Sequence, residues 1–328
     1  MAPMTRCFAA DGLVPAAAAQ SYYAARADAG LIVTEATLVD PRAQGYPRTP
    51  GIYTDAQLHA WRAVTDAVHV AGGRIFCQLW HTGRLAHSHY TGCWPLAPSA
   101  VAMEGPVPRA AGLVYEQPRA LQVDEIRALV MCFAQAARNA MEAGFDGVEL
   151  HAANGYLVDQ FLHQHTNRRE DEYGGSPQGR VRFALELIDS LLEAVGEYRA
   201  AIRLSPQAYI NLEYRPGDEA TFDVLLQQLN QRPLAYVHLA AFDASLEYDY
   251  LGGRPLDYVR TRFDGSLIAC GGYDPGAAEA ELRAGRADLV AFGRSFIANP
   301  DLVARAWSGR ELVPYEESML QQLCPGRS

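Results

Sequence analysis

Three polar side chains that can bind a substrate or move a proton lie within six residues: His151, Asn154 and Tyr156. They follow the short apolar run 148–150, which predicts a buried strand, and Gly144, which ends an alanine-rich helical pattern. If that strand belongs to a barrel of alternating strands and helices, its carboxyl end is where loops converge on a substrate. The three side chains are then catalytic candidates. A polar loop with a capping asparagine is the alternative interpretation of this stretch.

Composition limits the classes of partner. The 328 residues are 49% hydrophobic and carry a formal net charge of −10. The chain lacks the clustered Lys and Arg of a nucleic-acid surface, so we expect small molecules or a second copy of the chain as partners. No run approaches the length of an apolar membrane span and no signal-peptide pattern is present, so we expect no membrane insertion and a cytoplasmic location.

The cysteines and histidines do not form a recognisable metal or disulfide pattern. The six cysteines lie far apart without a CxxC pair, at Cys7, Cys77, Cys93, Cys132, Cys270 and Cys324. This spacing argues against a zinc knuckle or a disulfide framework and fits a reducing compartment. No Asp or Glu completes a ligand set with the histidines at 81, 87, 89, 163 and 165, so we expect no metal site.

The rest of the chain alternates between apolar runs and helical patterns. Strands are expected at 1–5, 31–35, 74–79, 147–150, 201–204, 235–239, 267–270 and 289–292. Helices are expected at 15–29, 54–70, 124–143, 179–195, 221–229, 256–260, 274–284 and from 299 onward. Eight strands alternating with helices predict an α/β fold, a single (β/α)8 TIM barrel with a shortened N-terminus. The aperiodic segment 83–119 is expected to be a lid or wall over a site.

We expect one domain over residues 1–328, because no repeat or biased linker divides the chain. A doubly wound sheet would need a glycine-rich fingerprint after its first strand, and residues 5–8 contain no glycine.

Residues just after the expected strands fit a flavin site. They are Thr5, Ala36, Gln78, Trp80, Arg203, Gly271, Gly272, Gly293 and Arg294. The two glycine turns and Arg294 would supply backbone N–H groups and charge to a phosphate. Thr5, Gln78 and Arg203 have the donors and acceptors to bind the edge of an isoalloxazine ring. Taken singly, each of these residues is more often a structural residue of a barrel rim.

Five segments carry a recognisable pattern over almost the whole chain. They are MAPMTR at 1–6, QLWH at 78–81, AGFDGVELHAANGY at 143–156, NRREDEYGGS at 167–176 and FGRSFIANPD at 292–301. Together they resemble the Old Yellow Enzyme family of FMN-dependent ene-reductases. The third segment and the loop at 171–176 are highly specific to that family. Thr5, where another branch of the family has cysteine, is typical of the classical branch.

The resemblance implies a role for each matching position. It implies noncovalent FMN held by Pro3, Met4, Thr5, Ala36, Gln78, Arg203, Gly271, Gly272, Gly293 and Arg294. It implies that His151 and Asn154 bind the substrate carbonyl, that Tyr156 protonates Cα, and that Trp80 and Tyr46 are substrate-binding walls. The implied reaction is a ping-pong cycle: hydride passes from NADPH or NADH to flavin N5, then to Cβ of an α,β-unsaturated carbonyl or related activated alkene.

Other functions stay open within the same resemblance. One is a member specialised for isomerising a biosynthetic enal or enone, and another is a non-catalytic flavin-binding protein, against which the intact His151, Asn154 and Tyr156 argue. The chain departs from the family pattern at its C-terminus, which lacks an aromatic residue and glycine-rich tail, so we expect an open pocket wall. It also departs before Thr5, where we expect either a natural start upstream of Met1 or weak FMN binding. Monomer and homodimer both fit.

Overall fold

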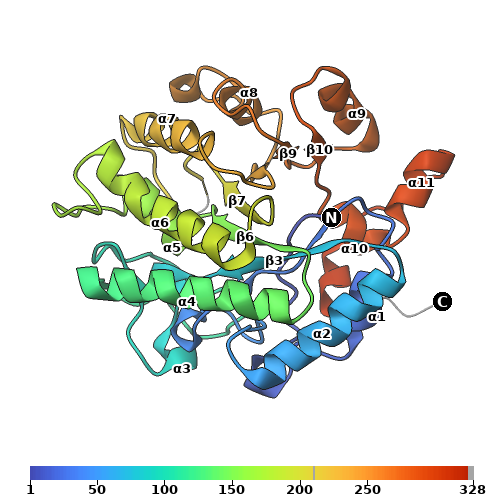
Figure 1. Cartoon of the computed structure of the whole chain (residues 1–328), viewed down its shortest axis with the longest axis horizontal. Coiled ribbons are helices and arrows are strands. Elements are labelled where there is room, and N and C mark those ends of the chain that lie inside the picture. The colour runs from blue at the N-terminus through green and yellow to red at the C-terminus, as the bar shows by residue number, and fades with distance from the viewer. Residues whose placement is uncertain (210, 324–328) are drawn as a thin grey trace.

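A curled parallel β-sheet forms the centre of the molecule (Figure 1). The computed structural model describes residues 1–209 and 211–323. The strands are β1 (Ile32–Val33), β2 (Thr37–Leu38), β3 (Ile75–Trp80), β6 (Gly147–Ala152), β7 (Ala200–Leu204), β8 (Val237–Leu239), β9 (Leu267–Ala269) and β10 (Leu289–Val290). Their order is β1-β3-β6-β7-β8-β9-β10, with β2 also paired to β3, and every pair is parallel. This is the order that helical crossovers between successive strands produce.

Helices pack around the outside of the sheet (Figure 1). They are α1 (Ala18–Ala24), α2 (Asp55–Val70), α3 (Ser88–Thr91), α4 (Val123–Glu142), α5 (Leu157–Leu162), α6 (Pro177–Val195), α7 (Asp218–Leu229), α8 (Pro255–Arg260), α9 (Pro275–Arg283), α10 (Arg294–Ala298) and α11 (Leu302–Ser308). The capping box expected at the start of α2 is present, because Thr54 Oγ1 accepts from Gln57 N and Gln57 Oε1 accepts from Thr54 N. Asp274 likewise caps α9 by accepting from Ala277 N at 2.8 Å.

The expected strand at 1–5 is wrong as a strand assignment. Its first two residues nevertheless lie between the two end strands: the Met1 amino group donates to Leu31 O at 2.6 Å, and Ala2 N donates to Phe292 O at 2.9 Å. Pro3 has no N–H, so the ladder cannot continue on that side. The sheet therefore has no continuous ladder between β1 and β10. Residues 1–2 bridge the gap, because Met1 O also accepts from Val33 N of β1 at 3.1 Å, while Ala2 makes the hydrogen bond to Phe292.

Two other expectations needed correction. The last helix does not begin at Asn299, because Asn299 ends α10, where its side chain donates to Ser295 O and Val313 O, and α11 starts at Leu302. The segment 83–119 is not aperiodic throughout, since it contains α3 and a separate two-stranded sheet of β4 (Leu96–Ala97) and β5 (Arg119–Ala120).

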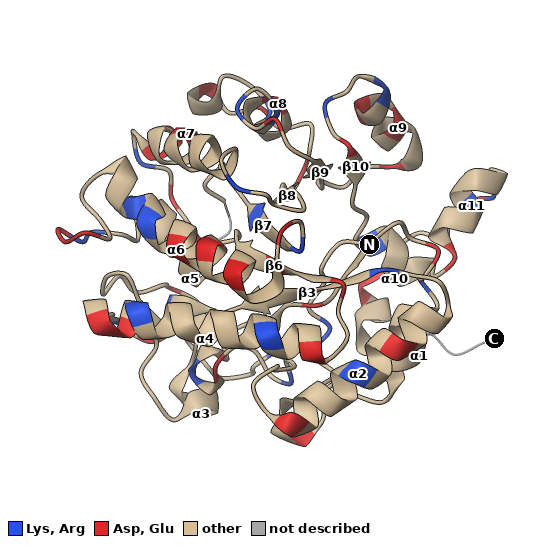
Figure 2. Cartoon of the chain, viewed as in Figure 1, with Lys and Arg blue, Asp and Glu red and all other residues tan. Residues whose placement is uncertain are grey.

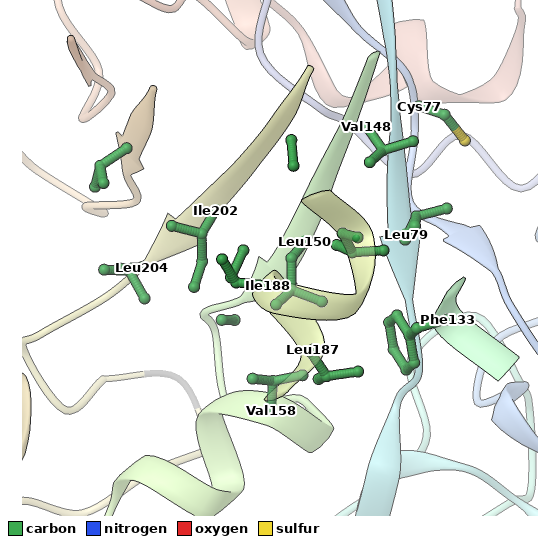
Figure 3. Close-up of a cluster of buried hydrophobic side chains, with 14 of the residues drawn as sticks. Cys77, Leu79, Phe133, Val148, Leu150, Val158, Leu187, Ile188, Ile202 and Leu204 are labelled. Atoms are coloured by element: carbon green, nitrogen blue, oxygen red, sulfur yellow. The ribbon is translucent and has the colours of Figure 1, made fainter. Parts of the chain in front are cut away.

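The main core lies between the sheet and the helices (Figure 3). From β6, Val148 and Leu150 pack outward among side chains such as Phe133 of α4 and Leu187 of α6. Side chains alternate along a strand, so the intervening Glu149 and His151 point to the inside of the curled sheet. The outward apolar packing of β6 thereby fixes the direction in which its polar residues face.

Charged groups of both signs lie on the outer helices, including α2, α4 and α6 (Figure 2). All 28 basic residues of the chain are arginine. Among the described residues, no helix is long and apolar enough to cross a membrane. The same part of the chain contains no cluster of three or more His, Cys, Asp or Glu side chains that could hold a metal ion. Five described cysteines are free, namely Cys7, Cys77, Cys93, Cys132 and Cys270. Cys324 lies outside the described residues.

Candidate active site

The three central candidates lie at the carboxyl end of β6 and in the loop that leads into α5. His151 is in β6 opposite Arg203 of β7, Asn154 adopts a left-handed conformation with φ of 61°, and Tyr156 immediately precedes α5. A left-handed non-glycine residue is uncommon and often marks a functional loop. The sharp turn at Asn154 lets residues 151 and 156 face each other across the loop.

Aromatic rings gather around Trp80, at the end of β3. Its ring stacks on Tyr46 with centroids 5.7 Å apart and on His151 with centroids 6.3 Å apart. The Tyr156 ring meets the Trp80 ring edge-on, with centroids 4.8 Å apart. Ala36 packs in the same cluster. The structure thus brings together the residues that the resemblance assigned to the substrate pocket.

Tyr156 is a protonated hydroxyl group at neutral pH. Burial raises the pKa of Tyr156 to about 12, although a hydrogen bond with Tyr46 opposes part of the rise. The two hydroxyl oxygens are 3.1 Å apart. Burial also raises the pKa of Tyr46 far above its ordinary value. Both groups keep a proton that can be donated.

His151 is neutral. Burial, followed by the nearby Arg203 guanidinium, lowers the pKa of His151 to about 3. Its Nδ1 atom is buried and has no hydrogen-bond partner among the described residues. A neutral imidazole still carries one N–H donor, so His151 can bind a carbonyl oxygen without bringing a charge. Asn154 Nδ2 donates to the Tyr209 hydroxyl at 2.5 Å, and its second N–H remains for a ligand.

A cavity of about 660 Å³ is lined by Asn154 and Tyr209. Six of the expected cofactor contacts also line it, namely Pro3, Met4, Arg203, Gly272, Gly293 and Arg294. The volume lies within the range of ordinary ligand sites. Arg203 and Arg294 form no ion pair within 4.0 Å among the described residues, and the Arg203 Nε atom is buried without a hydrogen-bond partner. Two guanidinium groups without an ion pair and one orphaned buried donor fit a phosphorylated cofactor with hydrogen-bonding ring atoms, such as FMN.

Four expected cofactor contacts, Thr5, Ala36, Gln78 and Gly271, do not line this cavity. Gln78 is buried and its Nε2 atom donates to Glu149 Oε1 at 2.7 Å. Thr5 is half-buried and follows Met4 directly. At Gly271 a Cβ atom would come within 2.8 Å of Ala244, so this glycine permits a close approach of two backbones. Gly272 has a left-handed φ of 78°, which glycine adopts without strain.

Sequence reasoning missed a buried charged network inside the sheet. Glu149 Oε2 lies 2.8 Å from His238 Nδ1, and both side chains are fully buried. Burial opposes the charged form of each, but their mutual attraction raises the pKa of His238 and lowers the pKa of Glu149. Glu149 and His238 are polar residues within otherwise apolar strand patterns, and this was the signal in the sequence that could have indicated the network.

A second missed network supports the loop that carries Asn154 and Gly155. Asp159 Oδ2 accepts from Gly155 N at 2.9 Å and from Ser205 Oγ at 3.1 Å, and Ser205 Oγ in turn accepts from Asn154 N at 3.0 Å. On its other side, Asp159 Oδ1 lies 3.3 Å from His163 Nε2. The backbone on both sides of the turn is therefore held by one buried carboxylate.

His163 completes this network. Its ring lies between Asp159 and Asp218, with Nδ1 at 3.2 Å from Asp218 Oδ2, and all three side chains are buried. Burial lowers the pKa of His163, but the two carboxylates outweigh burial and raise it to about 9. A charged imidazole thus links the loop after β6 to the start of α7.

Comparisons with known proteins agree on one family. Residues 1–313 match the family described as NADH:flavin oxidoreductase / NADH oxidase. The chain is 42% identical over 327 residues to the putative 12-oxophytodienoate reductase 2 of Oryza sativa subsp. japonica, covering 97% of this chain and 85% of the relative. It is 43% identical over 329 residues to the chanoclavine-I aldehyde reductase fgaOx3 of Penicillium roqueforti, covering 97% and 87%.

Solved structures give the same result. The Old Yellow Enzyme homologue from Zymomonas mobilis matches with a TM-score of 0.92 at 39% identity, covering 98% of this chain and 91% of the other. Morphinone reductase in complex with tetrahydroNAD matches with a TM-score of 0.89 at 44% identity, covering 98% and 89%. These matches confirm the resemblance drawn from the sequence motifs. The chain therefore belongs to the NADH:flavin oxidoreductase / NADH oxidase family, and it is an FMN-dependent alkene reductase of the Old Yellow Enzyme type.

Proposed function

We propose that this enzyme reduces the carbon–carbon double bond of α,β-unsaturated carbonyl compounds with NADPH or NADH as reductant, and that Tyr156 donates the proton to Cα. The observation that carries the proposal is that the ring centroids of His151 and Tyr156 lie 5.0 Å apart, while Asn154 between them in the chain lines the same cavity as Arg203. When bound, FMN supplies the hydride chemistry between nicotinamide and alkene. Tetrahydro-NAD bound to morphinone reductase supports a nicotinamide dinucleotide as the reductant.

The protein's own residues would bind and orient the alkene. The neutral N–H of His151 and the amide of Asn154 hydrogen-bond the carbonyl oxygen, where negative charge develops as the double bond is reduced. Trp80 and Tyr46 form an aromatic wall that keeps water from the reacting carbons. Tyr156 then transfers its phenolic proton to Cα, and the hydrogen-bonded Tyr46 hydroxyl stabilises the resulting phenolate.

For the cofactor, we propose contacts from Pro3, Met4, Thr5, Ala36, Gln78, Arg203, Gly271, Gly272, Gly293 and Arg294. Arg203 would bind the pyrimidine edge of the ring and Arg294 the phosphate. We also propose that residues 1–328 act as one domain and that the segment before Thr5 completes a closed (β/α)8 barrel at the gap between β1 and β10. A cytoplasmic location, and a monomeric or homodimeric state, stay predictions.

Anaerobic assay of NADPH oxidation with and without 2-cyclohexen-1-one tests this function. We expect oxidation beyond one equivalent of flavin only when the enone is present, with cyclohexanone formed in equal amount. Consumption of the enone without NADPH oxidation would instead indicate an isomerase. A protein that binds FMN but turns over neither compound would be a binding protein.

A further inference from the structure

A second cavity, of about 790 Å³, lies next to the proposed active site. It is lined by the loop after Thr5, including Arg6 and Cys7, by Pro47 and Arg48, by Arg109, and by part of the segment 317–321. Leu320 lines both this cavity and the one assigned above to FMN. Pro47 directly follows Tyr46, which stacks on Trp80. A ligand with one end at Tyr156 could therefore extend into this second cavity.

The cavity concentrates positive charge on a chain whose formal net charge is −10. Arg6, Arg48 and Arg109 line it, and among the described residues none of their guanidinium groups forms an ion pair within 4.0 Å. The nearby buried carboxylate of Glu35 accepts from the backbone N of Arg6 at 3.0 Å. Glu317 is the carboxylate on the same wall and is exposed. The Arg6 guanidinium is buried, and its Nε and Nη1 atoms have no hydrogen-bond partner in the described part of the chain. Arg48 and Arg109 are exposed, so it is their guanidinium groups that an anionic ligand in the cavity can reach.

The backbone around this cavity is strained. Seven described non-glycine residues have positive φ, and three of them, Cys7, Arg48 and Arg109, line this one cavity with φ of 62°, 51° and 61°. Such conformations are unfavourable for residues with a Cβ atom and persist only where surrounding contacts enforce them. Clusters of this kind are typical of ligand-binding sites.

Hydrogen bonds to backbone carbonyl groups hold each of the three guanidinium groups. Arg48 Nε donates to Ala9 O at 2.9 Å, and Arg109 Nη1 donates to Arg6 O at 3.2 Å. Arg6 Nη2 donates to Gln322 O at 2.6 Å. A guanidinium has five N–H groups, so each arginine keeps donors beyond those that hold the loops.

We propose that this cavity binds the oxyanion of a ligand whose other end reacts beside Tyr156. The oxyanion is either the carboxylate of an acidic activated alkene or a phosphate of the nicotinamide dinucleotide, since a guanidinium fork recognises both. This inference rests on the proposed function and narrows it: the enzyme prefers ligands that carry a negative charge remote from the reacting group.

The test uses the full chain with FMN bound and two alkenes that differ only in charge, 12-oxophytodienoate and its methyl ester. The variants are Arg48→Gln, Arg109→Gln and both together, because glutamine removes the charge and keeps an N–H donor. The matched control is Arg74→Gln, which removes one charge from an arginine whose side chain is 70% exposed and does not line the cavity.

We expect the double variant to lower kcat/KM for the acid by about 10- to 100-fold, as loss of charge-assisted hydrogen bonds implies. The ester and the Arg74→Gln protein should change less than about threefold. If flavin reduction at limiting NADH or NADPH falls instead, with acid and ester unchanged, the cavity holds a dinucleotide phosphate. Equal losses of kcat/KM for the acid and the ester would overturn the inference. So would an unchanged rate with the acid, the ester, NADH and NADPH.

The failure of the proposed function would be distinguishable. Turnover of neutral 2-cyclohexen-1-one by the unsubstituted protein tests that function and does not depend on the arginines. Titration of the flavin absorbance with the acid and with the ester tests the cavity even without turnover. Tighter binding of the acid that disappears in the double variant supports charge recognition, and equal affinities refute it.

Discussion

The buried His163 should make the stability of this protein depend on pH in a defined window. Its pKa in the folded protein is about 9, against an ordinary value of 6.5, because the carboxylates of Asp159 and Asp218 outweigh the effect of burial. A group whose pKa rises on folding stabilises the fold fully below its unfolded pKa and loses that contribution as pH rises through its folded pKa. The contribution is therefore present below about pH 6.5 and lost by about pH 9.5.

Its size follows from the two pKa values. At about 1.36 kcal/mol per pH unit, the shift corresponds to roughly 3 kcal/mol of unfolding free energy. Full burial of all three side chains means that solvent screens little of this effect. For a chain of this length, a change of that size shifts the melting temperature by about 4 °C.

The assay compares urea denaturation of the unsubstituted protein and His163→Gln at pH 6 and pH 9.5, with the same excess of FMN throughout. We expect the difference in unfolding free energy between the two proteins to shrink by about 3 kcal/mol from the lower to the higher pH. Other titrating groups cancel in this difference unless they couple to position 163. His165→Gln is the control, since burial lowers the pKa of His165, a shift opposite to that of His163. A difference that stays constant with pH would refute the ion-pair assignment.

Further outcomes follow from the active site. Tyr156→Phe should slow alkene reduction by about 10²- to 10⁴-fold and leave flavin reduction by NADPH nearly intact. Stopped-flow measurement of the two half-reactions checks this, with Tyr53→Phe as control. Equal slowing of both half-reactions would contradict the role of Tyr156. Because the pKa of His151 is about 3 and that of Tyr156 about 12, the affinity for a neutral enone should be constant from pH 5 to pH 9; a titration step in that range would show that one of them changes charge. His151→Ala should weaken the binding of phenols, measured by flavin absorbance, and an unchanged affinity would argue against its place at the carbonyl. Acid precipitation should release FMN into solution, and chromatographic recovery of FAD, or retention of the chromophore on the protein, would contradict noncovalent FMN.

Local sequence patterns predicted the elements that carry the site. The helix expected at 124–143 is α4 at Val123–Glu142, because its amphipathic period is regular, and the strand expected at 147–150 lies within β6. The capping box at Thr54 fixed the start of α2. Such features depend on residues close in the chain, so a single sequence contains the information.

The contacts that organise the site depend on residues far apart in the chain. Tyr209 bonds Asn154 across 55 residues, and Asp218 reaches His163 across 55 residues, so no local pattern indicates either pair. The left-handed turn at Asn154 results from Ser205 and Asp159 together. The first strand was mispredicted although the reason is local. The apolar composition of residues 1–5 indicated a strand, but Pro3 has no N–H group to continue a ladder.

The charged surface of this protein consists of guanidinium and carboxylate groups without a single lysine ammonium group. Unsaturated aldehydes and ketones are electrophiles, and aldehydes condense with primary amines to form imines. Guanidinium groups stay protonated and are poor nucleophiles at physiological pH. No side chain of this enzyme can therefore be lost to imine formation, and thiols such as the exposed Cys93 are left as its principal targets for such compounds.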